Sequence, residues 1–371
     1  MTEFTPVSVE AALAWIDGAT RCRETEEVAL NQAFGRVLGE DIRAAAPIPA
    51  VDCAAIDGFA VRAIESIGAG AYNPLAAPSV PVAAGEALPA GTDAVVPLDH
   101  VESVNGGDVV LVEPVAPGGN VDRQGSVAAT GGLLAAAGTR LMPRHVGLLA
   151  TAGFTGLPLI RRPRVRVAIA GAVRSSAAAD GDGPMLHAAI ERDGGVILES
   201  SPAEAFSATE ADIVIVAGGT GSGRADRLAA ALAAGGTLDI HGVTLVSGET
   251  TGFGRTATGV CLVLLPVAPA ACLLSYELFA GRAIRRLGGR DPALPCRSRM
   301  VTTARKIVSS IGATEICPVC LRSDGRIEPI VSFAEIGLMA AVQADGFIII
   351  REASEGYPSG ASVTAYFYDE C

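Results

Sequence analysis

The sequence predicts a multidomain α/β protein whose centre is a doubly wound parallel sheet. An elongated helical and β N-terminal part and a small C-terminal β barrel are expected to flank this sheet. The chain has 371 residues, which is enough for two or three domains. Between residues 161 and 292, apolar strand-like runs alternate with helical patterns, as in parallel sheets. Residues 51–120 and 293–371 consist of short alternating runs separated by glycine and proline, which favours small β structures.

The sequence predicts that the first 160 residues form two interleaved parts. Residues 1–50 and 121–160 are expected to form a helical and linker part, with a pair of helices over residues 8–38 and further helix around His145. Residues 51–120 are expected to form an inserted β subdomain, because glycine and proline recur there every few residues.

Residues 161–292 predict the α/β domain, and residues 293–371 the closing β domain. Buried strands should follow Arg161 and then cover residues 212–219 and 259–266. The expected helices cover residues 185–193, 224–234 and 269–287.

The charge balance disfavours one class of partner. The chain has 28 basic and 40 acidic residues, a net charge of −12, and Lys306 is its single lysine. A protein that binds the nucleic-acid backbone needs the opposite balance, so we expect no nucleic-acid partner. We attribute the preference for arginine to genomic base composition, because alanine and glycine are abundant as well.

A cytoplasmic location without a membrane span is expected. The N-terminus has no basic run or small-residue cleavage site, and it is acidic at Glu3 and Glu10. The segment from Thr256 to Tyr276 is uncharged and long enough to cross a bilayer. Pro266 and Pro269 interrupt it, so a buried strand, a turn and a buried helix explain it better.

Three turns follow the predicted strands of the α/β domain, at residues 170–175, 217–223 and 265–269. Ligands of such sheets bind outside the carboxyl ends of the strands. The glycine-rich turn at 217–223 is the best candidate, because glycine lets a ligand approach the backbone and the following helix start attracts anions. A tight strand-to-helix turn also prefers glycine for purely structural reasons, and the motif alone does not separate these readings.

Two other features carry reactive groups. Asp57 lies between apolar residues and a glycine, which predicts that these neighbours enclose its carboxylate. A buried acid of this kind either accepts structural hydrogen bonds or acts on a cation or a proton. Cys317 and Cys320 have the spacing of metal ligands, but a zinc site needs about four ligands and no second such pair exists. We expect the eight cysteines to be mostly buried thiols rather than disulfides.

Several strings in a fixed order resemble the molybdopterin molybdotransferase family, whose fold is shared with the carboxyl-terminal domain of gephyrin. The resemblance covers nearly the whole chain. The strings of this sequence that carry it are AFGRVLGED (33–41), VDCAAIDGFAVRA (51–63), LPAGTDAVVP (88–97), DIVIVAGG (212–219), ELFAGRAIRRL (277–287), ARKIVSSIG (304–312) and EGYPSG (355–360).

The resemblance implies a family chemistry in which molybdate enters the dithiolene of adenylated molybdopterin with Mg²⁺, and the adenylate is hydrolysed. It also implies a homodimer. The site residues that it marks are Asp57 as the catalytic group and, as the groups that bind molybdopterin or its adenylate, Gly218, Gly219, Gly221, Gly223, Asp226, Pro266 and Pro269.

The sequence departs from the family at polar site positions. The acid pair of the family string TGDEL reads Ala172 and Val173, the acid pair of GED reads Ser126 and Val127, and the basic string KPGKP reads VSGET at residues 246–250. Arg224 replaces an aspartate. Two functions therefore stay open. One is a divergent molybdotransferase that uses Asp57, and the other is a non-catalytic pterin-binding paralogue that serves a molybdoenzyme as carrier, chaperone or assembly partner.

Overall fold

The computed structural model describes residues 5–105, 108–169, 182–199, 210–219, 236–330, 332, 335 and 337–368. The chain divides into two compact units. Unit 1 contains residues 1–26, 35–37 and 159–371, and unit 2 contains residues 27–34 and 38–158. The predicted four-part division within these units stays a prediction.

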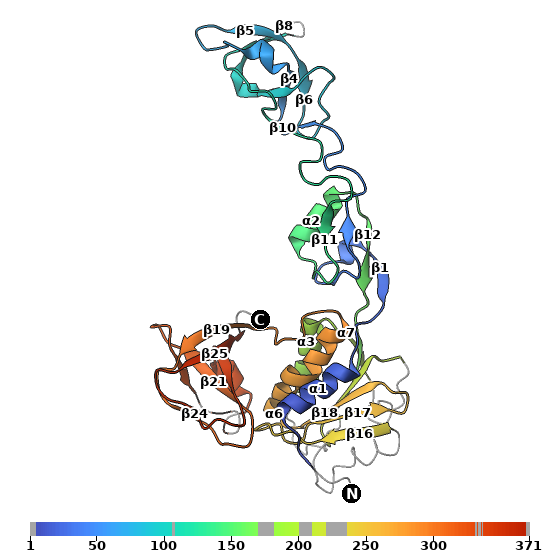
Figure 1. Cartoon of the computed structure of the whole chain (residues 1–371), viewed down its shortest axis with the longest axis vertical. Helices are drawn as coiled ribbons and strands as arrows, with labels where there is room; N and C mark the ends of the chain where they lie inside the picture. The colour runs from blue at the N-terminus through green and yellow to red at the C-terminus, as the bar shows by residue number, and fades with distance from the viewer. Residues whose placement is uncertain are drawn as a thin grey trace. The chain divides into compact units, whose positions relative to one another are not determined.

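Unit 2 is built from short strands, as the glycine and proline pattern predicts (Figure 1). Two three-stranded sheets, in the orders β6-β4-β7 and β5-β9-β8, enclose an apolar core of small side chains. Helix α2 (Pro143–Thr151) is the helix expected around His145. The strands are β2 (Ile42–Arg43), β3 (Cys53–Ala54), β4 (Gly58–Val61), β5 (Leu75–Pro78), β6 (Val80–Val82), β7 (Ala94–Pro97), β8 (Val101–Asn105), β9 (Asp108–Leu111), β10 (Val121–Asp122) and β11 (Leu133–Ala135).

The predicted pair of helices over residues 8–38 is wrong in its second half. Helix α1 (Val9–Ala19) forms, and the Ser8 hydroxyl caps it by accepting a hydrogen bond from the Ala11 amide at 3.1 Å. The next segment is strand β1 (Thr25–Ala29), followed by a single 3₁₀ turn. Its apolar residues are too few for a stable helix, so backbone pairing decides its conformation. Strand β12 (Gly156–Ile160) follows α2.

The centre of unit 1 is a six-stranded sheet in the order β14-β13-β15-β18-β17-β16. The first four strands are parallel, as predicted, whereas β17 near one edge runs antiparallel to both of its neighbours, β18 and β16. The predicted doubly wound parallel sheet is therefore extended at one edge by an antiparallel strand pair that the sequence did not predict. Their bounds are β13 (Arg164–Ile169), β14 (Val196–Glu199), β15 (Ile213–Ala217), β16 (Gly236–His241), β17 (Gly252–Thr256) and β18 (Cys261–Leu265).

The described helices of this domain cover one face of the sheet (Figure 1). Helix α3 (Asp182–Asp193) packs beside a continuous helical segment made of α6 (Pro269–Ser275), one π-helical turn (Tyr276–Ala280) and α7 (Gly281–Leu287). Helix α1 joins the same apolar core. The helix predicted over residues 224–234 lies outside the described residues.

The C-terminal part of unit 1 is a curled antiparallel sheet in the order β19-β25-β23-β21-β22, a half-barrel rather than a closed barrel (Figure 1). A two-stranded sheet of β20 and β24 and the short helix α9 (Met339–Gln343) accompany it. The strands are β19 (Arg297–Thr302), β20 (Ile307–Val308), β21 (Glu315–Leu321), β22 (Ile327–Pro329), β23 (Gly346–Ile350), β24 (Gly356–Tyr357) and β25 (Ser362–Phe367).

The uncharged segment from Thr256 to Tyr276 is a strand, a turn and a helix start, as predicted. No helix in the described part of the chain is long and apolar enough to cross a membrane. Cysteines 22, 53, 261, 272, 317 and 320 are free thiols. Cys296 is disulfide-bonded, so the expectation of thiols fails at this residue.

Candidate functional site

The carboxyl ends of three parallel strands, after which the predicted turns begin, lie side by side. Ile169, Ala217 and Leu265 are register partners at the ends of β13, β15 and β18. The described residues that follow β15 and β18 therefore leave the sheet side by side, where ligands of such folds bind. We call this the carboxyl edge. Its first predicted turn, residues 170–175, lies outside the described residues.

The glycine turn after β15 has a backbone that requires glycine. Gly218 and Gly219 have φ angles of +92° and +68°, in the left-handed region that other residues avoid. The Gly218 amide donates to the Leu265 carbonyl oxygen at 2.9 Å, which fixes the turn against the end of β18. The other predicted residues of this turn and its helix, Gly221, Gly223 and Asp226, lie outside the described residues.

The turn after β18 offers backbone donors. Pro266 is buried and Pro269 is the first residue of α6, while Val267 and Ala268 between them are exposed. The amides of Val267 and Ala268 donate to no other described residue. They lie at the start of a helical segment that runs to Leu287, so its dipole favours an anion there. The sequence prediction included the two prolines but not these backbone donors. A Pro-x-x-Pro turn directly before a helix is the sequence signal that could have indicated them.

The loop between β16 and β17 lies at the same edge, because His241 pairs with Gly252 and Gly252 with Leu264. The loop contains no lysine or arginine, and its one charged side chain is the exposed carboxylate of Glu249. Ser247 has a φ of +65°, and its amide donates to Glu249 Oε1 at 3.0 Å. This loop therefore adds an acid rather than a base to the carboxyl edge.

Asp57 lies in unit 2 and is exposed. The prediction that apolar neighbours enclose its carboxylate is therefore wrong. Its Oδ1 accepts a hydrogen bond from the Ala84 amide at 2.8 Å, which is the structural role that the sequence left open. Gly58 beside it is needed for packing, since a Cβ atom there would overlap the Val96 carbonyl oxygen.

The CxxC pair has no metal-binding geometry. Cys317 and Cys320 lie three residues apart on strand β21, so their side chains leave opposite faces of the sheet. Burial raises the pKa of the Cys317 thiol to about 12, and Cys320 donates weakly to the Gln343 carbonyl. Among the described residues, no group of three or more His, Cys, Asp and Glu side chains is placed to hold a metal ion.

Comparisons with known proteins cover both halves of the chain. Residues 7–153 match the family described as "MoeA N-terminal region (domain I and II)", and residues 177–286 match "Probable molybdopterin binding domain". A protein of Mycobacterium tuberculosis named molybdopterin molybdenumtransferase 2 is 31% identical over 326 residues, which cover 75% of this chain and 79% of that protein. The chain belongs to the MoeA family of molybdopterin molybdenumtransferases.

Further relatives agree over almost the full length. The molybdopterin molybdenumtransferase of Bacillus subtilis (strain 168) is 27% identical, with 97% of this chain and 93% of that protein covered. The crystal structure of a molybdopterin biosynthesis MoeA protein from Pyrococcus horikoshii superimposes with a TM-score of 0.76 at 25% identity, covering 98% of this chain and 99% of that one. The predicted family and the MoeA-like multidomain fold are confirmed.

Proposed function

We propose that this MoeA-family protein acts in molybdenum cofactor biosynthesis by binding molybdopterin or its adenylate at the carboxyl edge of the α/β sheet. The single observation that carries this proposal is the pair of turns that Gly218–Gly219 and Pro266–Pro269 form side by side. Relatives named molybdopterin molybdenumtransferase, and the match of residues 177–286 to a molybdopterin-binding family, support the choice of ligand.

The binding chemistry follows from the backbone. The amides of Val267 and Ala268, which donate to no other described residue, would donate to phosphate oxygens of the ligand, and the helix start behind them favours negative charge. Gly218 and Gly219 leave room for the ligand to approach the main chain. We propose that Gly221, Gly223 and Asp226 complete this site.

The residues present do not fit a family-type magnesium site. Mg²⁺ prefers carboxylate oxygens, and the family acids are replaced by Ala172, Val173, Ser126 and Val127. Loss of one transition-state donor typically lowers turnover ~10²–10³-fold, so several losses favour a chain that binds the pterin with little or no turnover. Such a protein would serve a molybdoenzyme as carrier, chaperone or assembly partner.

A divergent molybdotransferase is the second candidate, with molybdate as its other substrate. It is favoured by Asp57, which the chain retains in the family string and whose carboxylate is exposed. In this reading Asp57 is the catalytic group. For both candidates we propose a homodimer in the cytoplasm.

Titration of the purified protein with molybdopterin and with its adenylate tests the binding proposal. The variant Ala268→Pro removes one amide donor at a residue whose φ is already −72°, and Ala268→Ser is the matched control that keeps the donor. We expect the proline variant to bind the ligands about tenfold more weakly and the serine variant to bind normally. No binding to the wild type, or equal binding by both variants, would refute this site.

Turnover separates the two candidates. The protein, adenylated molybdopterin, molybdate and Mg²⁺ are mixed, and adenylate release is measured for the wild type and for Asp57→Asn. Release no faster than the background, together with tight pterin binding, supports the non-catalytic protein. Release that disappears in Asp57→Asn supports the molybdotransferase.

A further inference from the structure

A cavity of about 780 Å³ lies at the opposite edge of the same sheet, where the parallel strands begin. We call this the amino edge. Val165, Ile213 and Cys261 are register partners on β13, β15 and β18. Arg164, Asp212 and Val260 directly precede them, so these three residues lie side by side at the amino ends of the strands. The cavity volume lies within the range of small-molecule sites, roughly 300–1,000 Å³.

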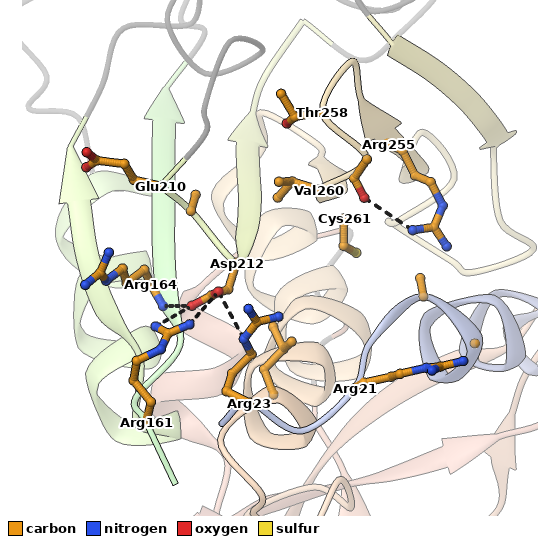
Figure 2. Close-up of a pocket in the computed structure, with 15 residues that line it drawn as sticks. Arg21, Arg23, Arg161, Arg164, Glu210, Asp212, Arg255, Thr258, Val260 and Cys261 are labelled. Atoms are coloured by element: carbon orange, nitrogen blue, oxygen red, sulfur yellow. Dashed lines mark hydrogen bonds and ion pairs between the residues drawn. The ribbon is translucent and has the colours of Figure 1, made fainter. Parts of the chain in front are cut away.

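The lining of this cavity is rich in arginine (Figure 2). It carries five arginines. Arg21 and Arg23 follow the end of α1, Arg161 precedes β13, Arg164 is the first residue of β13, and Arg255 lies on β17. Two acidic residues, Glu210 and Asp212, line the same cavity. A third acid, Glu24, is not part of the lining but pairs with Arg23 and Arg161. The pocket therefore has an excess of positive charge on a chain whose net charge is −12.

Two of these arginines are neutralised. Arg161 binds both oxygens of Asp212 at 2.9 Å, and Arg23 lies 3.1 Å from the same carboxylate (Figure 2). The Arg164 amide donates to Asp212 at 2.7 Å. The Asp212 side chain is only 6% exposed, so this carboxylate is already occupied and would not repel an incoming anion strongly.

Three arginines remain. Within the described ranges, Arg21, Arg164 and Arg255 have no carboxylate at ion-pair distance. The other acid of the lining, Glu210, is exposed. In Figure 2 their side chains stand apart from Asp212. A guanidinium group offers a planar set of donors that matches phosphate oxygens, and arginine is favoured where proteins recognise phosphate.

We propose that the amino edge is a second binding site, specific for a small phosphorylated molecule, with Arg21 and Arg255 as its principal anion ligands. This site does not depend on the proposed pterin site, which lies at the other end of the same strands. The sheet would then bind two anionic ligands at its two ends.

The chain contains its own reporter for this site. Trp15 is the single tryptophan, and the Arg255 guanidinium lies 5.6 Å from the centre of its ring. An anion that draws Arg255 into the pocket would change this cation–π contact and hence the fluorescence of Trp15.

The test uses the full-length protein, with inorganic pyrophosphate and inorganic phosphate as probes at low ionic strength and without divalent cations. Calorimetry measures affinity and stoichiometry, and Trp15 fluorescence reports where the probe binds. We expect one pyrophosphate per chain, tighter binding than for phosphate, a change in Trp15 emission, and weaker binding as salt is added. No saturable binding of pyrophosphate in the millimolar range would overturn the proposal.

Variants locate the bound probe. Arg21→Gln and Arg255→Gln should each weaken pyrophosphate binding about tenfold, as expected for one lost charge-assisted hydrogen bond. Thr258→Glu places an acid on the exposed turn of the lining and should weaken it at least as much. The matched control is Arg144→Gln, an exposed arginine of α2 in the other unit, which should bind normally.

The proposal is overturned if pyrophosphate binds the wild type and all amino-edge variants equally. Loss of binding in Ala268→Pro alone would have the same consequence, because it would assign the probe to the carboxyl edge. Failure of molybdopterin to bind, with pyrophosphate binding lost in Arg21→Gln and Arg255→Gln, refutes the proposed pterin site and leaves this one supported.

Discussion

Gly281 at the start of α7 offers a sharp test of the packing in unit 1. A glycine inside a helix usually destabilises it by about 1 kcal/mol relative to alanine, so Gly281→Ala would ordinarily stabilise the protein. Here a Cβ atom would lie 2.7 Å from Asp193 Oδ2 and 2.8 Å from Arg285 Nη1. Both distances are shorter than a carbon atom tolerates, so these side chains must move.

The groups that must move are held in a buried network. Asp193 accepts a hydrogen bond from the Tyr276 hydroxyl at 3.0 Å and pairs with Arg285 at 3.0 Å. The Asp193 and Arg285 side chains are 1% and 5% exposed, so neither can turn to water. Breaking a buried ion pair costs about 3–5 kcal/mol, which exceeds the gain in helix propensity. We therefore expect Gly281→Ala to lower the free energy of unfolding by ~2–4 kcal/mol.

Urea unfolding followed by Trp15 fluorescence measures this effect, because the single tryptophan lies in unit 1 and packs on Phe253. The matched control is Gly18→Ala in α1, where a Cβ atom meets nothing within 4 Å. The control should leave stability unchanged or raise it by up to ~1 kcal/mol. A Gly281→Ala protein as stable as the wild type would show that the buried network does not constrain this position.

Asp57→Ala removes the acceptor for the Ala84 amide and should cost up to about 1 kcal/mol in thermal unfolding, whereas Asp57→Asn keeps an acceptor oxygen and should cost less; equal losses would contradict the structural role. The Arg282 guanidinium lowers the pKa of Asp17, so this ion pair stabilises the fold above the ordinary aspartate pKa of about 4 and is lost as pH falls through the folded value. Urea unfolding from about pH 5 to pH 2 should therefore show a steeper loss for the wild type than for Asp17→Asn, and parallel curves would refute this. Burial raises the pKa of Cys317 to about 12, so iodoacetamide at about pH 8 should leave this thiol unlabelled in the folded protein. Mass spectrometry checks this, and rapid labelling would contradict the burial.

The parallel core of the sheet could be predicted because its signals are local. β15 and β18 are apolar runs bounded by turns, as parallel strands that are buried on both faces require. β13 reads RVRVAI, in which valines alternate with arginines before an apolar end. The carboxyl edge followed from the same pattern, since three parallel strands must end together. The amides of Val267 and Ala268, which donate to no other described residue, were not predicted because residue types mark functional side chains and not backbone donors.

The antiparallel edge could not be predicted because its strands do not look like strands. β17 reads GFGRT, and glycine weakens a strand in isolation. The structure gives the reason for Gly254, since a Cβ atom there would overlap the Thr237 carbonyl oxygen of β16. Close contact between backbones therefore decides this element, and such contact depends on tertiary pairing that short sequence windows do not contain.

The amino edge shows why the net charge of a chain says little about local binding. A charge of −12 disfavours a nucleic-acid partner, because such partners need an extended basic surface. A small phosphorylated molecule needs only a few guanidinium groups that converge on one cavity. Arg21, Arg164 and Arg255 are far apart in sequence, and all three line the same cavity. The strand register brings Arg164 and Arg255 to this end of the sheet, and the end of α1 brings Arg21. Base composition explains the preference for arginine over most of the chain. Where the fold brings several of these arginines to one cavity, they still form a local anion site.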